Sequence, residues 1–116
     1  MLKHVLAFCI LAVPALADSP RVTDVRGLRG AGGWSFSVTV SHADEGWDHY
    51  ADGWEIAGPD GTQFGFRTLH HPHEGEHSFT RSLSGVRIPE GVDEVHVRAR
   101  DNVHGWGAPV IYRLPR

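Results

Sequence analysis

The chain has 116 residues, of which 41% are hydrophobic, so it is long enough for one globular domain with its own core. Eleven basic residues against fourteen acidic ones give a net charge of −3 when histidine is neutral. This balance argues against nucleic-acid binding, which usually needs a basic surface. Nine histidines are present, and four of them lie in one short stretch.

The first 17 residues have the layout of a secretory signal peptide. Lys3 gives a basic start, an apolar run follows over residues 5–13, and Ala15-Leu16-Ala17 forms a small-residue cleavage pattern. The apolar run is too short to span a bilayer of about 30 Å. We therefore expect cleavage after Ala17, export to the periplasm or the exterior, and a single domain over residues 18–116 with no membrane span. Cleavage removes the chain's one cysteine and one methionine, so the exported part has no disulfide and no sulfur ligand.

The remaining sequence has no helical period, and Gly or Pro interrupts it every eight to twelve residues. The clearest element is a run in which Trp34, Phe36, Val38 and Val40 alternate with serine and threonine, so one face of a strand should be core and the other solvent. We expect seven strands, over residues 21–28, 34–41, 53–57, 63–69, 77–83, 94–100 and 110–114. Short strands at this spacing are typical of a sandwich or a barrel.

Two consecutive segments resemble fibronectin type III domains. Residues 79–91 contain Leu83 and a short Pro89-Glu90-Gly91 turn, and residues 95–105 contain an alternating strand that ends in Ala99-Arg100-Asp101-Asn102. This order is similar to the region of strands E and F in that family, although the usual tyrosine at the start of strand F is absent. The strand count and the resemblance imply an all-β fold, a seven-stranded immunoglobulin-like or fibronectin III-like antiparallel β-sandwich. Such a fold names no function, because it supports many unrelated ones.

The most distinctive stretch, residues 69–79, reads Leu-His-His-Pro-His-Glu-Gly-Glu-His-Ser-Phe. It places His70, His71, His73 and His77 in one expected loop between two strands. Imidazole and carboxylate groups are ligands of borderline divalent metals, and a loop can bring several of them to one point. The alternative is a polar hairpin loop that is merely solvated.

The strand order predicts where this loop lies. Successive strands of a sandwich run up and down, so the loops over residues 43–50, 70–76 and 101–109 should share one end. With the adjoining strand ends, these loops contain seven of the eight histidines that follow the signal peptide, which are His42, His49, His70, His71, His73, His77 and His104. His96 is the exception, because it falls on the outward face of an expected strand.

These positions suggest a set of metal ligands. His71 and His73 are two residues apart and can face the same side in extended backbone, with His77 opposite them across the hairpin. His42, His49, His70 or His104 would add a nitrogen, and Asp44 or Asp48 a carboxylate or an acceptor for an imidazole N–H. A nitrogen-rich site without sulfur suits Cu(II), Zn(II) or Ni(II). The sequence therefore predicts a small exported metal-binding module, Cu(II) or Zn(II), for buffering, delivery or sensing.

Two other functions remain open. Trp47, Tyr50 and Trp106 lie in the same loops and would form an aromatic surface for a protein or a glycan. An enzyme is the third possibility, but the exported part has no cysteine nucleophile, and the chain has no nucleophile elbow and no zincin motif. We therefore expect no catalytic residues and no organic cofactor.

Overall fold

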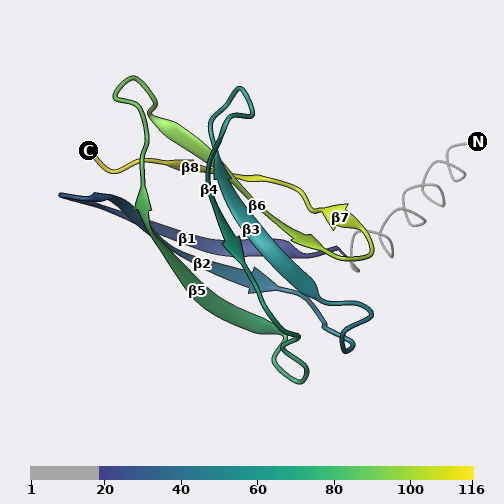
Figure 1. Cartoon of the computed structure of the whole chain (residues 1–116). Helices are drawn as coiled ribbons and strands as arrows, with labels where there is room; N and C mark the ends of the chain where they lie inside the picture. The colour runs from purple at the N-terminus through teal and green to yellow at the C-terminus, as the bar shows by residue number, and fades with distance from the viewer. Residues whose placement is uncertain (1–18) are drawn as a thin grey trace, which may run out of the picture.

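Two antiparallel sheets form the structure, a computed structural model that describes residues 19–116 (Figure 1). One sheet has three strands in the order β1-β2-β5, and the other has five, with β4-β3-β6-β7 in a row and β8 on β6. The strands are β1 (Arg21–Gly30), β2 (Gly33–Ser41), β3 (Ala51–Ala57), β4 (Gln63–Thr68), β5 (Ser78–Val86), β6 (Glu94–Asp101), β7 (Gly105–Trp106) and β8 (Val110–Arg113). The expected all-β, antiparallel architecture is confirmed. The expected signal peptide, residues 1–17, lies outside the described residues.

The three-stranded sheet is built on β2, whose alternating sequence decides its two faces. Trp34, Phe36, Val38 and Val40 are buried, and the serines and threonines between them are partly exposed. On the outer face, the hydroxyl groups of Thr39 and Thr80 are 2.7 Å apart and join β2 to β5. The period of two in the sequence therefore gives the inner and outer faces correctly.

The second sheet has β3 at its centre, and this strand is buried almost throughout. Trp54 and Ile56 point into the core with no exposed surface. Glu55 points to the outer face, where its carboxylate accepts hydrogen bonds from Gln63 Nε2 at 2.7 Å and Arg98 Nε at 2.6 Å. The buried charge is tolerated because both of its oxygens have a partner.

The last strand ties the two sheets together. The hydroxyl group of Tyr112 in β8 accepts a hydrogen bond of 2.9 Å from the backbone N–H of Gly27 in β1. A Cβ at position 27 would lie 2.9 Å from the ring of Phe36 and 3.1 Å from the ring of Tyr112, so only glycine permits this approach. Buried side chains of both sheets form one continuous core.

The strand count differs from the seven expected, because the loop over residues 101–109 contains the two-residue strand β7. Arg100 pairs with Trp106 and Asp101 with Gly105, and Gly105 has a φ of 78°, which allows the tight turn. β7 and β8 both pair with β6. A two-residue strand leaves no alternation in the sequence, so the pattern could not reveal it.

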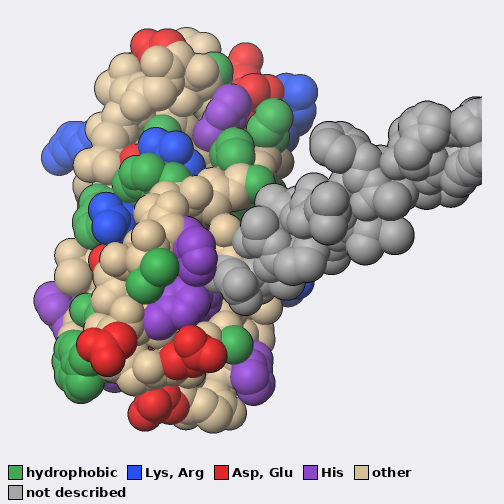
Figure 2. Space-filling model, turned by 90° about the vertical axis from the view of Figure 1, so that its right-hand side faces the viewer, with side chains coloured by type: hydrophobic (Ala, Val, Ile, Leu, Met, Phe, Trp, Pro, Cys, Tyr) green, Lys and Arg blue, Asp and Glu red, His purple; other side chains and the backbone are tan. Residues whose placement is uncertain are grey.

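The three loops that follow β2, β4 and β6 meet at one end of the structure, as the strand order predicted (Figure 1). His42 N–H donates to the carbonyl group of His77 at 2.9 Å, and Asn102 N–H donates to that of Tyr50 at 3.2 Å. Most of the imidazole surface visible in Figure 2 lies at one end, beside acidic side chains. No helix within residues 19–116 is long and apolar enough to cross a membrane.

Candidate metal centre

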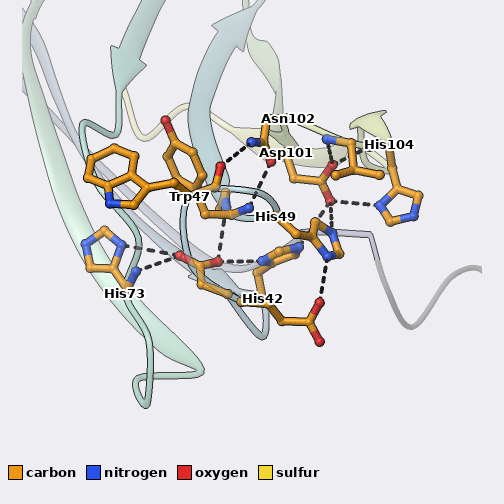
Figure 3. A network of polar contacts seen from close by, with 12 residues as sticks. His42, Trp47, His49, His73, Asp101, Asn102 and His104 are labelled. Carbon is orange, nitrogen blue, oxygen red and sulfur yellow. Dashed lines mark hydrogen bonds and ion pairs between the residues drawn. The ribbon is translucent and has the colours of Figure 1, made fainter.

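The carboxylate of Asp101 is the centre of a cluster of imidazoles (Figure 3). Asp101 is the last residue of β6 and has no exposed surface. Its Oδ1 accepts the backbone N–H groups of Val103, at 2.9 Å, and of His104. Its Oδ2 faces three ring nitrogens, which are His42 Nε2 at 3.1 Å, His49 Nε2 at 3.2 Å and His104 Nδ1 at 3.1 Å. One oxygen is therefore fixed by the backbone, and the other faces the imidazoles.

The cluster is compact and open on one side. One ligand atom from each of His42, His49 and Asp101 lies within 4.8 Å of the other two. The ring centroid of His49 is 4.9 Å from that of His42 and 5.0 Å from that of His104. The His42 side chain is 1% exposed, against 18% for His49 and 37% for His104.

Asp44 lies behind His42 and connects the loops. Its Oδ1 is 2.5 Å from His42 Nδ1 and accepts the N–H of Ala51 at 3.0 Å. Its Oδ2 accepts the N–H of His73 at 2.7 Å, so a single side chain joins the end of β2, the start of β3 and the loop before β5. The Asp44 side chain is fully buried. Its predicted role as an acceptor for an imidazole N–H matches this geometry.

His49 has the same arrangement as His42. Its Nε2 faces Asp101 and its Nδ1 lies 3.2 Å from Glu45 Oε1. Two imidazoles thus each turn Nε2 to the shared carboxylate and Nδ1 to a second one. The contact of Nδ1 with a carboxylate is the one that orients a histidine ligand in metal sites, while Nε2 of each ring is paired with Asp101.

The contacts of Asp101 and His49 shift their pKa values in opposite directions, down for the carboxyl group and up for the imidazole. Burial alone would raise the pKa of the Asp101 carboxyl group. The hydrogen bonds donated by His104, Val103 and His49 outweigh burial and hold this pKa at about 2. Burial would lower the pKa of His49, but its bonds to Glu45 and Asp101 prevail and raise it. In the absence of a metal, the two groups favour an imidazolium–carboxylate pair.

His73 is close to this cluster, but its ring is held differently. It stacks on Phe79 with ring centroids 3.9 Å apart, and its Nε2 lies 3.0 Å from the Arg81 guanidinium. Burial and the positive charge of Arg81 lower the pKa of His73. Its Nδ1 is buried without a hydrogen-bond partner among the described residues, 3.8 Å from Asp44 Oδ2. The neutral ring therefore serves as packing against β5.

The other three histidines of the loop do not join the cluster. His70, His71 and His77 are exposed, and within residues 19–116 no group of three close ligand atoms includes any of them or His73. The rings of His71 and His73 lie close together, as expected, with centroids 5.2 Å apart, but among the described residues no third ligand atom, from His77 or elsewhere, completes a group with them. The reason is local, because the turn at Gly75, with φ of 79°, leaves His77 outside while Phe79 and Arg81 hold His73 inside.

Two residues of the cluster, Asp101 and Glu45, were not among the predicted ligands. Glu45 carries no signal beyond its place near His49. Asp101 does, because Val95, Val97 and Ala99 point inward and the period of two places Asp101 on the same face. An acidic side chain that points inward at the end of a strand must be paired when it is buried. This position in the sequence therefore indicates that polar partners surround Asp101.

The three loop aromatics have different surroundings. The exposed ring of Trp47 (64%) makes an edge contact with Tyr50, with centroids 5.5 Å apart. Trp106 instead contacts Phe66, at 6.2 Å, and lies beneath the guanidinium of Arg98, at 4.2 Å. A shared surface of all three rings is not supported by their ring contacts.

The chain is similar to a protein of Halomicrobium mukohataei that carries the name "Putative lipoprotein". The two are 44% identical over 88 residues, which is 74% of this chain and 42% of the other protein. The chain thus spans less than half the length of that relative. No protein-family model matches the chain, and no solved structure matches it either.

Proposed function

We propose that the protein is a metal-binding module whose site consists of His42, His49 and Asp101, with His104 as a fourth ligand. The observation that carries this proposal is the single oxygen, Asp101 Oδ2, with three imidazole nitrogens 3.1 to 3.2 Å away. Three nitrogens and one carboxylate oxygen are a donor set for Zn(II) or Cu(II).

The spacing supports the binding of an ion. Ligands about 2.0 to 2.1 Å from a tetrahedral ion are roughly 3.3 Å from one another. The distances from Asp101 Oδ2 to the three nitrogens are close to this edge length. His42, His49 and Asp101 each already have one ligand atom within 4.8 Å of the other two, whereas His104 is not part of this group and would have to turn towards the other imidazoles to share an ion with them.

The surroundings support the same conclusion. Asp44 and Glu45 would accept the N–H groups of His42 and His49, which fixes the ring orientation and raises the basicity of the ligating nitrogens. The two backbone N–H groups on Asp101 Oδ1 leave Oδ2 to ligate alone. The site thus has its orienting groups in place before any ion arrives.

The topology supports assignment to the immunoglobulin-like and fibronectin III-like sandwiches. The order β1-β2-β5 corresponds to strands A-B-E, and β3-β6 with the strands after them to C-F-G. β4 pairs with β3 and continues the second sheet. We propose this class as the finer description of the fold.

Two observations support a location outside the cytoplasm. Residues 1–17 have the pattern of a signal peptide, and the Halomicrobium relative is named a lipoprotein, a class of exported proteins. We propose that this chain too is exported and binds its ion outside the cytoplasm without catalysis, for buffering, delivery or sensing.

A second candidate is recognition of a protein at the loop end through Trp47 and Tyr50. The exposed Trp47 ring, held by Tyr50, favours it because aromatic anchors dominate many binding surfaces. If so, Trp47→Ala would abolish capture of the partner, and removal of metal would have no effect.

Thermal melting with Zn(II), with Cu(II) and with EDTA tests the proposal. An ion at 100 times its Kd should add about 2.7 kcal/mol to the free energy of unfolding. The double variant His42→Ala/His49→Ala should lose this gain, whereas the triple variant His70→Ala/His71→Ala/His77→Ala should keep it. A gain lost only in the triple variant, or no gain in the unmodified protein, would refute the site.

A further inference from the structure

The four groups of the proposed metal site are held with very different firmness. Asp101 and His42 are at strand ends, have side chains at most 1% exposed, and have a further hydrogen-bond partner on the opposite atom. His49 is 18% exposed, and its second partner, Glu45, is 73% exposed. The side chains of the site are therefore held less and less firmly from Asp101 towards the surface.

His104 is the least firmly held of the four groups. Its side chain is 37% exposed and follows the end of β6 in the turn that Gly105 closes. The polar contact of its ring among the described residues is the one to Asp101, at 3.1 Å, with no second carboxylate behind it. His104 thus lacks the orienting partner that His42 and His49 each have.

The approach to the site is strongly anionic. The three loops over residues 42–50, 69–77 and 101–107 contain six acids and no Lys or Arg. The acids are Asp44, Glu45, Asp48, Glu74, Glu76 and Asp101. Asp44 and Asp101 are buried in the site itself, so the exposed rim consists of Glu45, Asp48, Glu74 and Glu76, which attract cations and repel phosphates and other anions. It suits a site whose cargo is the metal ion itself more than one whose metal acts on an anionic substrate.

We propose that the ion enters and leaves on the side of His49 and His104, with His104 as the first ligand to be exchanged. This inference rests on the proposed metal-binding function. An acceptor that brings its own imidazole, carboxylate or thiolate donor would replace His104 on the ion while His42 and Asp101 still hold it. The ion would then pass to the acceptor by ligand exchange, without being released into solution.

Transfer of Zn(II) to a chromogenic chelator, 4-(2-pyridylazo)resorcinol, tests this in stopped flow. For the unmodified protein, the rate should rise with chelator concentration, because the chelator must attack before the ion leaves. His104→Ala should still bind one ion but transfer it at least about tenfold faster, since a lost metal contact typically costs that much or more. His96→Ala, on the outer face of β6, is the matched control and should transfer at the unmodified rate.

The outcomes separate the two proposals. Equilibrium dialysis that shows no Zn(II) on the unmodified protein would refute the metal site and this inference with it. Stoichiometric binding together with an unchanged transfer rate in His104→Ala would refute the exchange route alone. So would complete loss of Zn(II) from His104→Ala, provided that His104→Asn, a smaller change, loses it too and both keep the circular dichroism of the folded protein.

Discussion

Asp101 Oδ2 lies 3.1 Å from His42 Nε2, although 59 positions separate the two residues in the chain. The contact links the two sheets, because His42 follows β2 of the three-stranded sheet and Asp101 ends β6 of the five-stranded one. The two buried polar side chains pair with each other across the sheets, and each has further partners, Asp44 for His42 and the residues around His104 for Asp101, so neither buries an unsatisfied charge. The cluster thus serves the fold as well as the proposed metal site.

Replacement of Asp101 tests both roles. Asp101→Asn keeps an oxygen for the N–H groups of Val103 and His104 but offers an amide to the imidazoles. We expect metal affinity to fall by at least about tenfold to a hundredfold and the metal-free protein to lose about 1 to 3 kcal/mol. Isothermal titration and urea unfolding measure the two effects. Asp48→Asn, an exposed acid of the neighbouring loop, is the control, and an equal effect there would contradict the assignment.

Asp44 should matter for stability even when no metal is present. Asp44→Ala leaves the N–H groups of Ala51 and His73 and the Nδ1 of His42 without their acceptor. Each unsatisfied buried donor costs about 1 to 3 kcal/mol, so we expect a loss of at least about 2 kcal/mol in urea unfolding. Asp44→Asn keeps one acceptor oxygen and should recover part of this loss. A variant as stable as the unmodified protein would show that the three loops do not depend on this side chain.

The low pKa of Asp101 predicts an acid limit for the metal-free protein. The folded pKa is about 2, below the ordinary 3.8, so the ionised form stabilises the fold. That contribution is fully present above about pH 4 and is lost as the pH falls towards 2. Urea unfolding in EDTA between pH 2 and 6 should show it, and Asp101→Asn should flatten the profile. A profile unchanged by Asp101→Asn would assign the acid sensitivity to other carboxylates.

The raised pKa of His49 predicts that stability has the opposite pH dependence at higher pH. Its pKa is raised above 6.5, so its contribution is present below that value and is lost as the pH rises through the folded pKa. In EDTA, stability should therefore decline above about pH 6.5, and His49→Gln should remove the decline. With Zn(II) present the trend should reverse, because a neutral imidazole is needed to ligate the ion. A decline that persists in His49→Gln would contradict this origin.

Replacement of Trp47 and replacement of Trp54 by alanine should have very different effects on the free energy of unfolding. Trp54 has no exposed surface, and Trp54→Ala should cost about 3 to 5 kcal/mol because it leaves a cavity between the sheets. Trp47 is 64% exposed, and Trp47→Ala should stay within about 0.5 kcal/mol of the unmodified protein. Chemical denaturation compares them. A large loss at Trp47 would show that its ring seals the loop end instead of being available to a partner.

Most of the fold could be predicted from the sequence, because alternation fixes strand faces wherever a strand is long enough. β2 and β6 show this, as do the buried Trp34 and Trp54. The meeting of the three loops followed from the strand order, because every second connection in such a sandwich lies at the same end. β7 could not be predicted, since two residues give no period.

The candidate site could be predicted only in part. The strand order correctly brought His42, His49 and His104 to one end, with Asp44 beside them. Which histidines turn inward was decided by contacts between distant residues, such as the stacking of His73 on Phe79 and its contact with Arg81. For the same reason the densest run of histidines in the sequence is mostly exposed, and the shared acceptor, Asp101, lies elsewhere.

Anomalous diffraction at the zinc edge, on crystals grown with one equivalent of Zn(II), tests the central claim most directly. We predict one strong peak about 2.0 to 2.2 Å from His42 Nε2, His49 Nε2 and Asp101 Oδ2, with His104 as the fourth ligand. A peak among His70, His71 and His77 with none at Asp101, or no peak at all, would contradict it.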